Sequence, residues 1–122
     1  MHYKNLEKIL NDYSFKKSQS KEQYYLTTNI VLNNTSNNLV IYATIIDNKI
    51  IFSDNCQLID CFNIPDEEIE YINNEILKPL LIKDMFIESC SIKMLVDGLR
   101  FGLEISDYIK TIVLLENKLV NG

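Results

Sequence analysis

Few residues in this 122-residue chain combine the type and the setting that catalysis requires. The single histidine, His2, adjoins the first residue, whereas serine, cysteine and zinc enzymes need an imidazole held in a fixed place. The three cysteines, Cys56, Cys61 and Cys90, form no CxxC pair and have no neighbouring base or cation that would activate a thiol. We therefore expect no catalytic histidine, and we expect unpaired thiols that behave as small buried apolar groups.

The acidic residues are the second candidate for chemistry. Asp66 follows Pro65, and Glu88 and Lys93 lie downstream; a metal-dependent nuclease uses these residue types, but the last two are not in E-x-K spacing. Carboxylates alone indicate a metal site only weakly, and the three glycines form no phosphate-binding loop. We predict a protein that is not an enzyme and uses no metal or cofactor. The catalytic alternative is an unorthodox small enzyme that uses Asp54, Asp60 or Cys61.

The composition is typical of a small globular domain. A chain with 47% hydrophobic and 24% charged residues can close a core, and its length is near that of one domain, so we predict a single domain over residues 1–122. The apolar runs are far shorter than the ~20 residues of a membrane helix. The first residues carry charges that a signal peptide would not have in its apolar region. We expect a cytoplasmic protein without a membrane partner.

The first half of the sequence predicts a helix followed by a sheet. Apolar residues at helical spacing indicate a helix over residues 3–13. Runs rich in Tyr, Thr, Ile and Val predict strands over residues 24–32, 39–46 and 49–53. Asp47-Asn48, between the last two strands, suits a two-residue type I′ turn because both residues tolerate positive φ. These strands are expected to form a three-stranded antiparallel meander.

The segment after the meander is less regular. Residues 57–62, QLIDCF, fit either a helical turn or a short strand. A helix is predicted over residues 64–78, with Asn63 as its N-cap and Pro65 in its first turn. Residues 84–90 fit one further short strand.

The last segment predicts a long helix. Ser91 is the expected N-cap, and the helix is expected from residue 92 to about residue 118, with an apolar stripe that includes Leu95, Leu99 and Leu103. Gly98 and Gly102 would mark either a close helix crossing or a break in this helix. The predicted fold class is therefore α+β: an N-terminal helix, a three-stranded antiparallel β-meander, a helix, a short strand and a long C-terminal helix.

The net charge of −5 is unevenly distributed along the chain. Residues 1–25 have five lysines against three acidic residues, whereas residues 26–122 have seven basic against fourteen acidic residues. Nucleic-acid-binding proteins need a dense basic face, and Arg100 is the single arginine available for base recognition. This balance argues against direct nucleic-acid binding and favours a protein partner.

Tyrosines and exposed acids are the candidates for contact with that partner. The chain has seven tyrosines, a residue that is enriched at interfaces. Neighbouring residues of a strand face opposite sides of a sheet, so one of Tyr24 and Tyr25 must point away from the core. The predicted partner-binding residues are Tyr24, Tyr25, Asp54, Asn55, Asp66, Glu67, Glu68 and Glu70.

The stretch NLVIYATIIDNKIIFSDNCQLIDCFNI resembles an uncharacterised family of small bacterial and phage domains. In that family a strand pair leads into a Leu/Phe-Ser/Thr-Asp-Asp-Gly turn and then an apolar pair. The matching residues here are Phe52, Ser53, Asp54 and Asn55 in the turn, with Leu58 and Phe62 as the apolar pair. Cys56 replaces the glycine of the family motif. The resemblance spans residues 24–115 and implies a mobile-element setting without implying an activity.

Two hypotheses for the function follow. The first is a non-enzymatic protein-binding module, encoded by a phage or another mobile element, that inhibits or regulates a host protein such as a defence nuclease. The alternative is a dimeric regulatory protein similar to secretion chaperones, which are small acidic α-β-β-β-α proteins that hold a peptide segment. That likeness concerns element order and charge, which is an analogy between folds. It predicts a homodimer.

Overall fold

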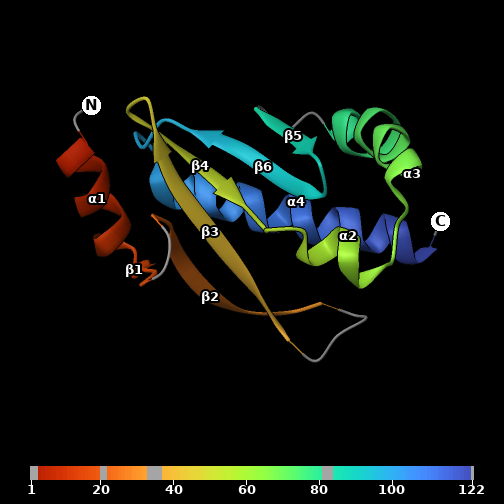
Figure 1. The fold of residues 1–122 in the computed structure, drawn as a ribbon, viewed down its shortest axis with the longest axis horizontal. Helices are drawn as coiled ribbons and strands as arrows, with labels where there is room; N and C mark the ends of the chain where they lie inside the picture. The colour runs from red at the N-terminus through yellow and green to blue at the C-terminus, as the bar shows by residue number, and fades with distance from the viewer. Residues whose placement is uncertain (1–2, 20–21, 33–36, 81–83, 122) are drawn as a thin grey trace.

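The computed structural model describes residues 3–19, 22–32, 37–80 and 84–121, and His2 lies outside them. Its centre is a six-stranded sheet in which every strand pair is antiparallel, in the order β1-β2-β3-β4-β6-β5 (Figure 1). The strands are β1 Lys16–Lys17, β2 Tyr24–Val31, β3 Asn38–Ile46, β4 Lys49–Ser53, β5 Met85–Glu88 and β6 Ser91–Val96. The fold class is α+β, as predicted.

The helical elements lie before, between and after the strands in sequence, with α2, α3, η1 and η2 between β4 and β5. The first helix, α1, precedes the sheet, and the longest, α4, follows it and runs behind the strands in the view of Figure 1. The elements are α1 Tyr3–Asp12, α2 Gln57–Cys61, α3 Asp66–Tyr71, the π-helical η1 Ile72–Leu77, the 3₁₀-helical η2 Lys78–Leu80 and α4 Phe101–Asn121. Among the described residues, no helix has the length and apolar character needed to cross a membrane.

The predicted meander is confirmed as β2, β3 and β4. Asp47 and Asn48 have φ of 51° and 60°, as a type I′ turn requires, and the ladder continues directly from the Ile46–Lys49 pair. Where β4 ends, the Gln57 side chain replaces it beside β3: its amide donates to the Val40 carbonyl at 2.7 Å and accepts the Val40 N–H at 3.0 Å. The undecided segment of residues 57–62 therefore begins as a helix, α2, whose first side chain completes the sheet.

The three-stranded count is wrong because the sheet has three further strands. The error with the largest effect concerns Ser91, which begins β6 instead of capping a helix. In β6 the buried residues Ile92, Met94 and Val96 alternate with more exposed ones, which is the period of a strand. Gly98 follows in a turn with φ of 84°, and the helix begins only at Phe101.

The predicted apolar stripe of the last helix is wrong at its start. Leu95 lies in β6 and Leu99 in the turn, and Leu103 is 59% exposed, so none of the three lies in the core. The residues of α4 that are fully buried or nearly so are Phe101, Tyr108, Thr111, Ile112, Leu115 and Glu116. The predicted helix over 64–78 is present, but as α3 continued by the π-helical η1.

The core lies between the sheet and α4. Phe52, fully buried in β4, contacts Phe101 and Tyr108 of α4 with ring centroids 5.4 and 5.6 Å apart. Phe15, next to β1, stacks on Phe52 at 5.9 Å. Aromatic pairs in these geometries add about 0.5–1.5 kcal/mol each beyond their buried area. This cluster fixes which face of the sheet is the inner one.

Candidate functional site: the open face of the sheet

No helix of the described residues lies over β3, β4 and β6 on the sheet face opposite α4 (Figure 1). The residues of this face follow from the register, since Tyr24, Ala43, Phe52 and Met94 pair across the strands and are all buried on the inner side. Their neighbours along each strand must point to the other side. We define the open face as the seven residues Tyr25, Tyr42, Thr44, Ile51, Phe86, Lys93 and Leu95, which occupy those positions.

The open face is arranged in rows across the strands. One row pairs Tyr25 with Tyr42, which pairs with Ser53, then Lys93 and then Phe86. A second row pairs Thr44 with Ile51 and then Leu95. All seven side chains of the open face are half-buried or exposed. Three of them, Thr44, Ile51 and Lys93, border a shallow cavity of about 130 Å³. The face therefore presents aromatic and aliphatic groups to the surface.

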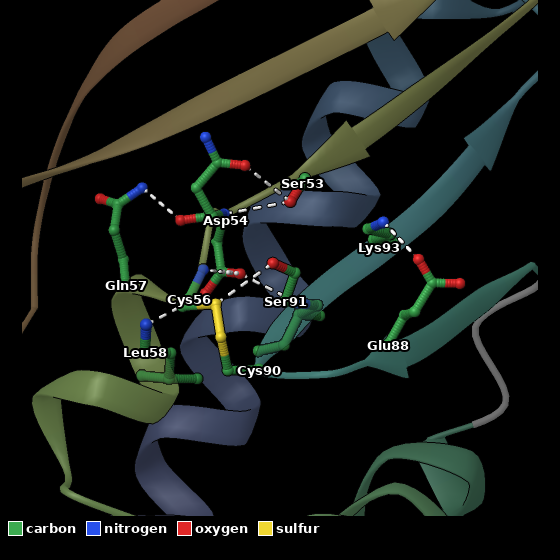
Figure 2. The surroundings of a disulfide bond; sticks show 11 residues. Ser53, Asp54, Cys56, Gln57, Leu58, Glu88, Cys90, Ser91 and Lys93 are labelled. Carbon is green, nitrogen blue, oxygen red and sulfur yellow. Dashed lines mark hydrogen bonds and ion pairs between the residues drawn. A yellow bond between two sulfur atoms is a disulfide. The ribbon is translucent and has the colours of Figure 1, made fainter. Parts of the chain in front are cut away.

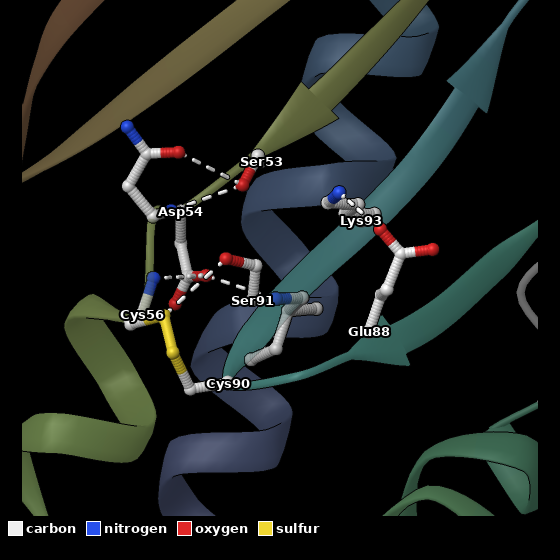
Figure 3. A network of polar contacts seen from close by, with 9 residues as sticks. Ser53, Asp54, Cys56, Glu88, Cys90, Ser91 and Lys93 are labelled. Carbon is white, nitrogen blue, oxygen red and sulfur yellow. Dashed lines mark hydrogen bonds and ion pairs between the residues drawn. A yellow bond between two sulfur atoms is a disulfide. The ribbon is translucent and has the colours of Figure 1, made fainter.

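A turn at one end of the open face is held by short polar contacts. The Ser53 hydroxyl lies 3.1 Å from the Asn55 side-chain oxygen and accepts the Asn55 N–H at 3.0 Å (Figure 3). Asn55 and Cys56 both have positive φ, which an asparagine tolerates better than most residues. Asn55 is exposed and borders the shallow cavity. The predicted contact residue Asn55 therefore lies at the rim of the open face.

Asp54, in the same turn, lies inside the protein and not on its surface. It is fully buried, and its carboxylate accepts the N–H groups of Cys56 at 3.2 Å, Leu58 at 3.0 Å and Ile92 at 2.9 Å. Burial raises the pKa of Asp54, and these three N–H donors oppose the rise. Asp54 therefore joins the β4–α2 turn to β6 and is out of reach of a partner, contrary to its predicted contact role.

Two cysteines beside Asp54 form a disulfide, so the prediction of unpaired thiols is wrong for them. The Cys56–Cys90 bond connects the β4–α2 turn to the β5–β6 turn, and its Cα atoms are 4.8 Å apart (Figure 2). The β4–β6 pairing brings the two turns together: Ser53, the last residue of β4, is opposite Lys93, and each cysteine lies three residues beyond that pair. Structural disulfides are typical of oxidising compartments. The cytoplasmic location stays a prediction, and a structural disulfide is unusual in that compartment.

The two predicted tyrosines separate as expected. Tyr24 is buried, and its hydroxyl donates to the Glu7 carboxylate, so it belongs to the core, contrary to its predicted contact role. Tyr25 lies on the open face. The other predicted contact residues, Asp66, Glu67, Glu68 and Glu70, are exposed in α3 and do not join the open face. Asp66 and Glu70 border a separate cavity of about 460 Å³ against Ile87 at the β5 edge.

The residues of the catalytic alternative do not converge. Asp60 and Cys61 border a cavity of about 270 Å³, whereas the Asp54 carboxylate is held by the backbone elsewhere. Glu88 and Lys93 form an ion pair of 2.7 Å between β5 and β6. Within the part of the chain that the structure describes, no three His, Cys, Asp or Glu side chains are grouped as metal ligands would be.

Sequence reasoning missed most of the open face. Tyr42, Ile51 and Phe86 were expected only as strand residues, and the signal that could have found them is their alternation with buried neighbours. Which of the two alternating sets faces solvent depends on where α4 packs. That helix was predicted to begin nine residues too early, at residue 92.

Compared with protein-family models, curated proteins and solved structures, the chain shows no significant match to any of them. The resemblance to small phage domains and the likeness to secretion chaperones therefore remain predictions. The open face has to be interpreted from its own geometry and charge.

Proposed function

We propose that the protein is a non-enzymatic protein-binding module that holds a segment of a partner protein on its open face. The observation that carries the proposal is a helix-free sheet face with three aromatic side chains, Tyr25, Tyr42 and Phe86, at the surface. Aromatic residues are enriched at interfaces. Tyr25 and Tyr42 are neighbours across two strands, and Phe86 lies at the far end of the same row, beyond β4 and β6.

A polypeptide suits the chemistry of the open face. Successive rows are two residues apart along each strand, about 6.8 Å, which is also the spacing of side chains on one side of an extended segment. Thr44 and the two tyrosine hydroxyls can bond to main-chain groups of such a segment, while Ile51 and Leu95 contact its apolar side chains. Tyrosine combines a large apolar area with a polar end, which adapts it to this task.

The charges on and around the open face argue against a nucleic acid as its partner. Aromatic residues on a sheet can stack on bases, but such sites combine the rings with a basic groove. The one lysine of the open face, Lys93, is ion-paired with Glu88, and Arg100 lies outside the face. A chain with net charge −5 would repel phosphates further.

The identity of the partner is part of the proposal. A host protein that is inhibited or regulated by a phage-encoded or mobile-element-encoded binder is the first candidate. The alternative is a dimeric, chaperone-like protein holding a peptide. The helix α1, the meander β2–β4 and the helix α2 support it, although the two-residue β1 adds a fourth strand to that order. A homodimer in solution would favour the alternative, and a monomer that binds a folded host protein would favour the first candidate.

The test is a tagged capture from a lysate of the host cells, treated with nuclease, with three forms of the chain. The forms are the wild type, Tyr42→Lys on the open face, and Tyr71→Lys, which changes a 63% exposed tyrosine on α3. We expect one protein that the wild type and Tyr71→Lys retain in stoichiometric amount and that Tyr42→Lys loses. Equal retention by all three forms, or capture abolished by nuclease, would contradict the proposal. Circular dichroism establishes that each variant is folded.

A further inference from the structure

A second surface feature adjoins the open face where β6 ends and α4 begins. It is a cavity of about 500 Å³, and Leu95 contributes to both the cavity and the open face. The polar groups around it include Lys49, Asp97, Arg100, Glu104 and Asp107. A segment lying along the open face would therefore reach this cavity without leaving the surface.

The cavity is acidic. Four carboxylates, those of Asp84, Asp97, Glu104 and Asp107, face two cations, Lys49 and Arg100. Asp97 is tied to the backbone, since its carboxylate accepts the Leu99 N–H at 2.8 Å. The local charge thus has the same sign as the net charge of the chain.

Glu104 is the carboxylate whose bonding is incomplete. Its Oε2 accepts the Asp97 N–H at 3.2 Å, whereas its Oε1 is buried and has no donor among the described residues. Burial, followed by the neighbouring Asp97 carboxylate, raises the pKa of Glu104. A cationic group in the cavity would reduce the repulsion between the Glu104 and Asp97 carboxylates.

Exposed leucines lie next to these carboxylates. Leu99 is 77% exposed and lines the cavity, and Leu103, in the first turn of α4, is 59% exposed. Leu95 and Leu99, both exposed, place an apolar rim beside the acidic groups of the cavity. A bare metal ion would leave this rim uncovered, whereas the long side chain of lysine or arginine combines an apolar stem with a charged end.

We propose that this cavity binds a lysine or arginine side chain of the partner segment, with apolar neighbours of that residue lying on Leu95 and Leu99. The inference rests on the proposed function and specifies the partner: a basic residue between apolar residues. Charge complementarity selects this occupant over an acidic segment, because the cavity already has more carboxylates than cations.

The test begins with a library of random peptides displayed against the full chain. We expect the selected peptides to share a basic residue flanked by apolar ones. The affinity of one selected peptide, and of the same peptide with glutamine at the basic position, is then measured against the wild type, Glu104→Gln and Glu67→Gln. Glu67→Gln removes the same charge from exposed α3, outside the cavity.

A double-mutant cycle decides the result. We expect Glu104→Gln to weaken the binding of the basic peptide about tenfold and to leave the binding of the glutamine peptide unchanged. A tenfold change corresponds to about 1.4 kcal/mol of coupling. Glu67→Gln should weaken the binding of the basic peptide less than Glu104→Gln does. Peptides that bind without a basic residue, or equal losses with both variants, would overturn this inference and leave the proposed function intact. A library that yields no peptide sensitive to Tyr42→Lys would overturn the proposed function itself.

Discussion

Ile92, the second residue of β6, has both of its backbone polar groups bonded to side chains from other elements. Its N–H donates to the Asp54 carboxylate at 2.9 Å, and its carbonyl accepts the Tyr108 hydroxyl at 2.6 Å. Burial, followed by the nearby Asp54, raises the pKa of Tyr108 well above its ordinary value. One buried acid thus connects the β4–α2 turn, the start of β6 and, through Ile92, the middle of α4.

The substitution Asp54→Asn tests this role. Two N–H donors, those of Cys56 and Ile92, share one carboxylate oxygen, and Leu58 donates to the other. An amide has a single oxygen, so its NH₂ group would face the N–H of Leu58 and leave it without an acceptor. We expect a loss of about 1–3 kcal/mol in the free energy of unfolding, the usual cost of such a group. Urea denaturation measures it, and unchanged stability would contradict the role.

The difference in the free energy of unfolding between the wild type and Asp54→Asn should depend on pH. The folded pKa of Asp54 is above its ordinary value of 3.8, so the folded protein holds the proton more tightly than the unfolded chain. The resulting stabilisation is complete below pH 3.8 and is lost as the pH rises through the raised folded pKa. The difference in unfolding free energy between the wild type and Asp54→Asn should therefore narrow with rising pH in that range. Denaturation curves at a series of pH values measure it, and a constant difference would argue against the raised pKa.

At the scale of elements, the disulfide joins two turns that would otherwise depend on the strand pairing of β4 and β6. Cys56 and Cys90 are separated by 34 residues, and closing a loop of that length in the unfolded chain is worth about 3–4 kcal/mol. We expect Cys90→Ser to lower the free energy of unfolding by about this amount, and Cys61→Ser, which leaves the disulfide intact, to change it little. Urea denaturation with and without a reductant is the measurement. Equal stability of the two variants would mean that the disulfide does not stabilise the fold.

The turn between β6 and α4 makes a second prediction at this scale. Gly98 has φ of 84°, where a side chain costs about 1–2 kcal/mol, so Gly98→Ala should destabilise the protein by that amount. Gly102 lies within α4, and an added Cβ would be 3.3 Å from the hydroxyl of Tyr13, a half-exposed side chain that can shift. Because alanine favours a helix by about 1 kcal/mol over glycine, Gly102→Ala should cause no loss. Thermal unfolding compares the two variants, and a similar loss from both would refute the assignment of Gly98 to the turn.

The elements that the sequence predicts well are those with one dominant period. The β3–β4 hairpin follows from strand composition and from Asp47-Asn48, and α1 follows from helical spacing. The segment from Ser91 contains two periods: Ile92, Met94 and Val96 alternate as in a strand, while Leu95, Leu99 and Leu103 repeat at four residues as in a helix. The second pattern led to the wrong prediction, and with β6 unrecognised the Cys56–Cys90 pairing could not be foreseen.

The failure to recognise β6 also limited the prediction of the candidate site. Tyr25 was predicted as a surface residue because adjacent strand residues face opposite sides. The rest of the open face could not be assigned, since the packing of α4 decides which side of a sheet is covered. The acidic cavity could not be predicted either, because Asp97 and Glu104 were expected within one helix. In the structure a turn at Gly98 brings them together.

At the scale of the whole molecule, the protein is two layers with one side of its sheet uncovered. The inner face is closed by α4 through Phe52, Phe101 and Tyr108, and those contacts supply the core. The open face contributes less to the core and is the proposed binding surface. If the proposal holds, stability and binding belong to opposite sides of the same strands, and each can be changed without the other.

Tyr24 and Tyr25 test this division because they are adjacent in β2 and face opposite sides. Tyr24→Ala removes a buried ring and its bond to Glu7, so we expect a loss of about 3–5 kcal/mol in the free energy of unfolding, as for other large aromatic residues in a core. Tyr25→Ala removes a half-buried ring from the open face, and we expect it to cost under about 1 kcal/mol. The effects on binding should be the opposite. Tyr25→Ala should weaken the binding of the captured partner or of the selected peptide. Tyr24→Ala, at a low temperature where it stays folded, should bind like the wild type. Urea denaturation and peptide titration of both variants measure the two effects. If Tyr25→Ala proves the more destabilising change, the uncovered side of the sheet has been misassigned, and the open face cannot be the binding surface.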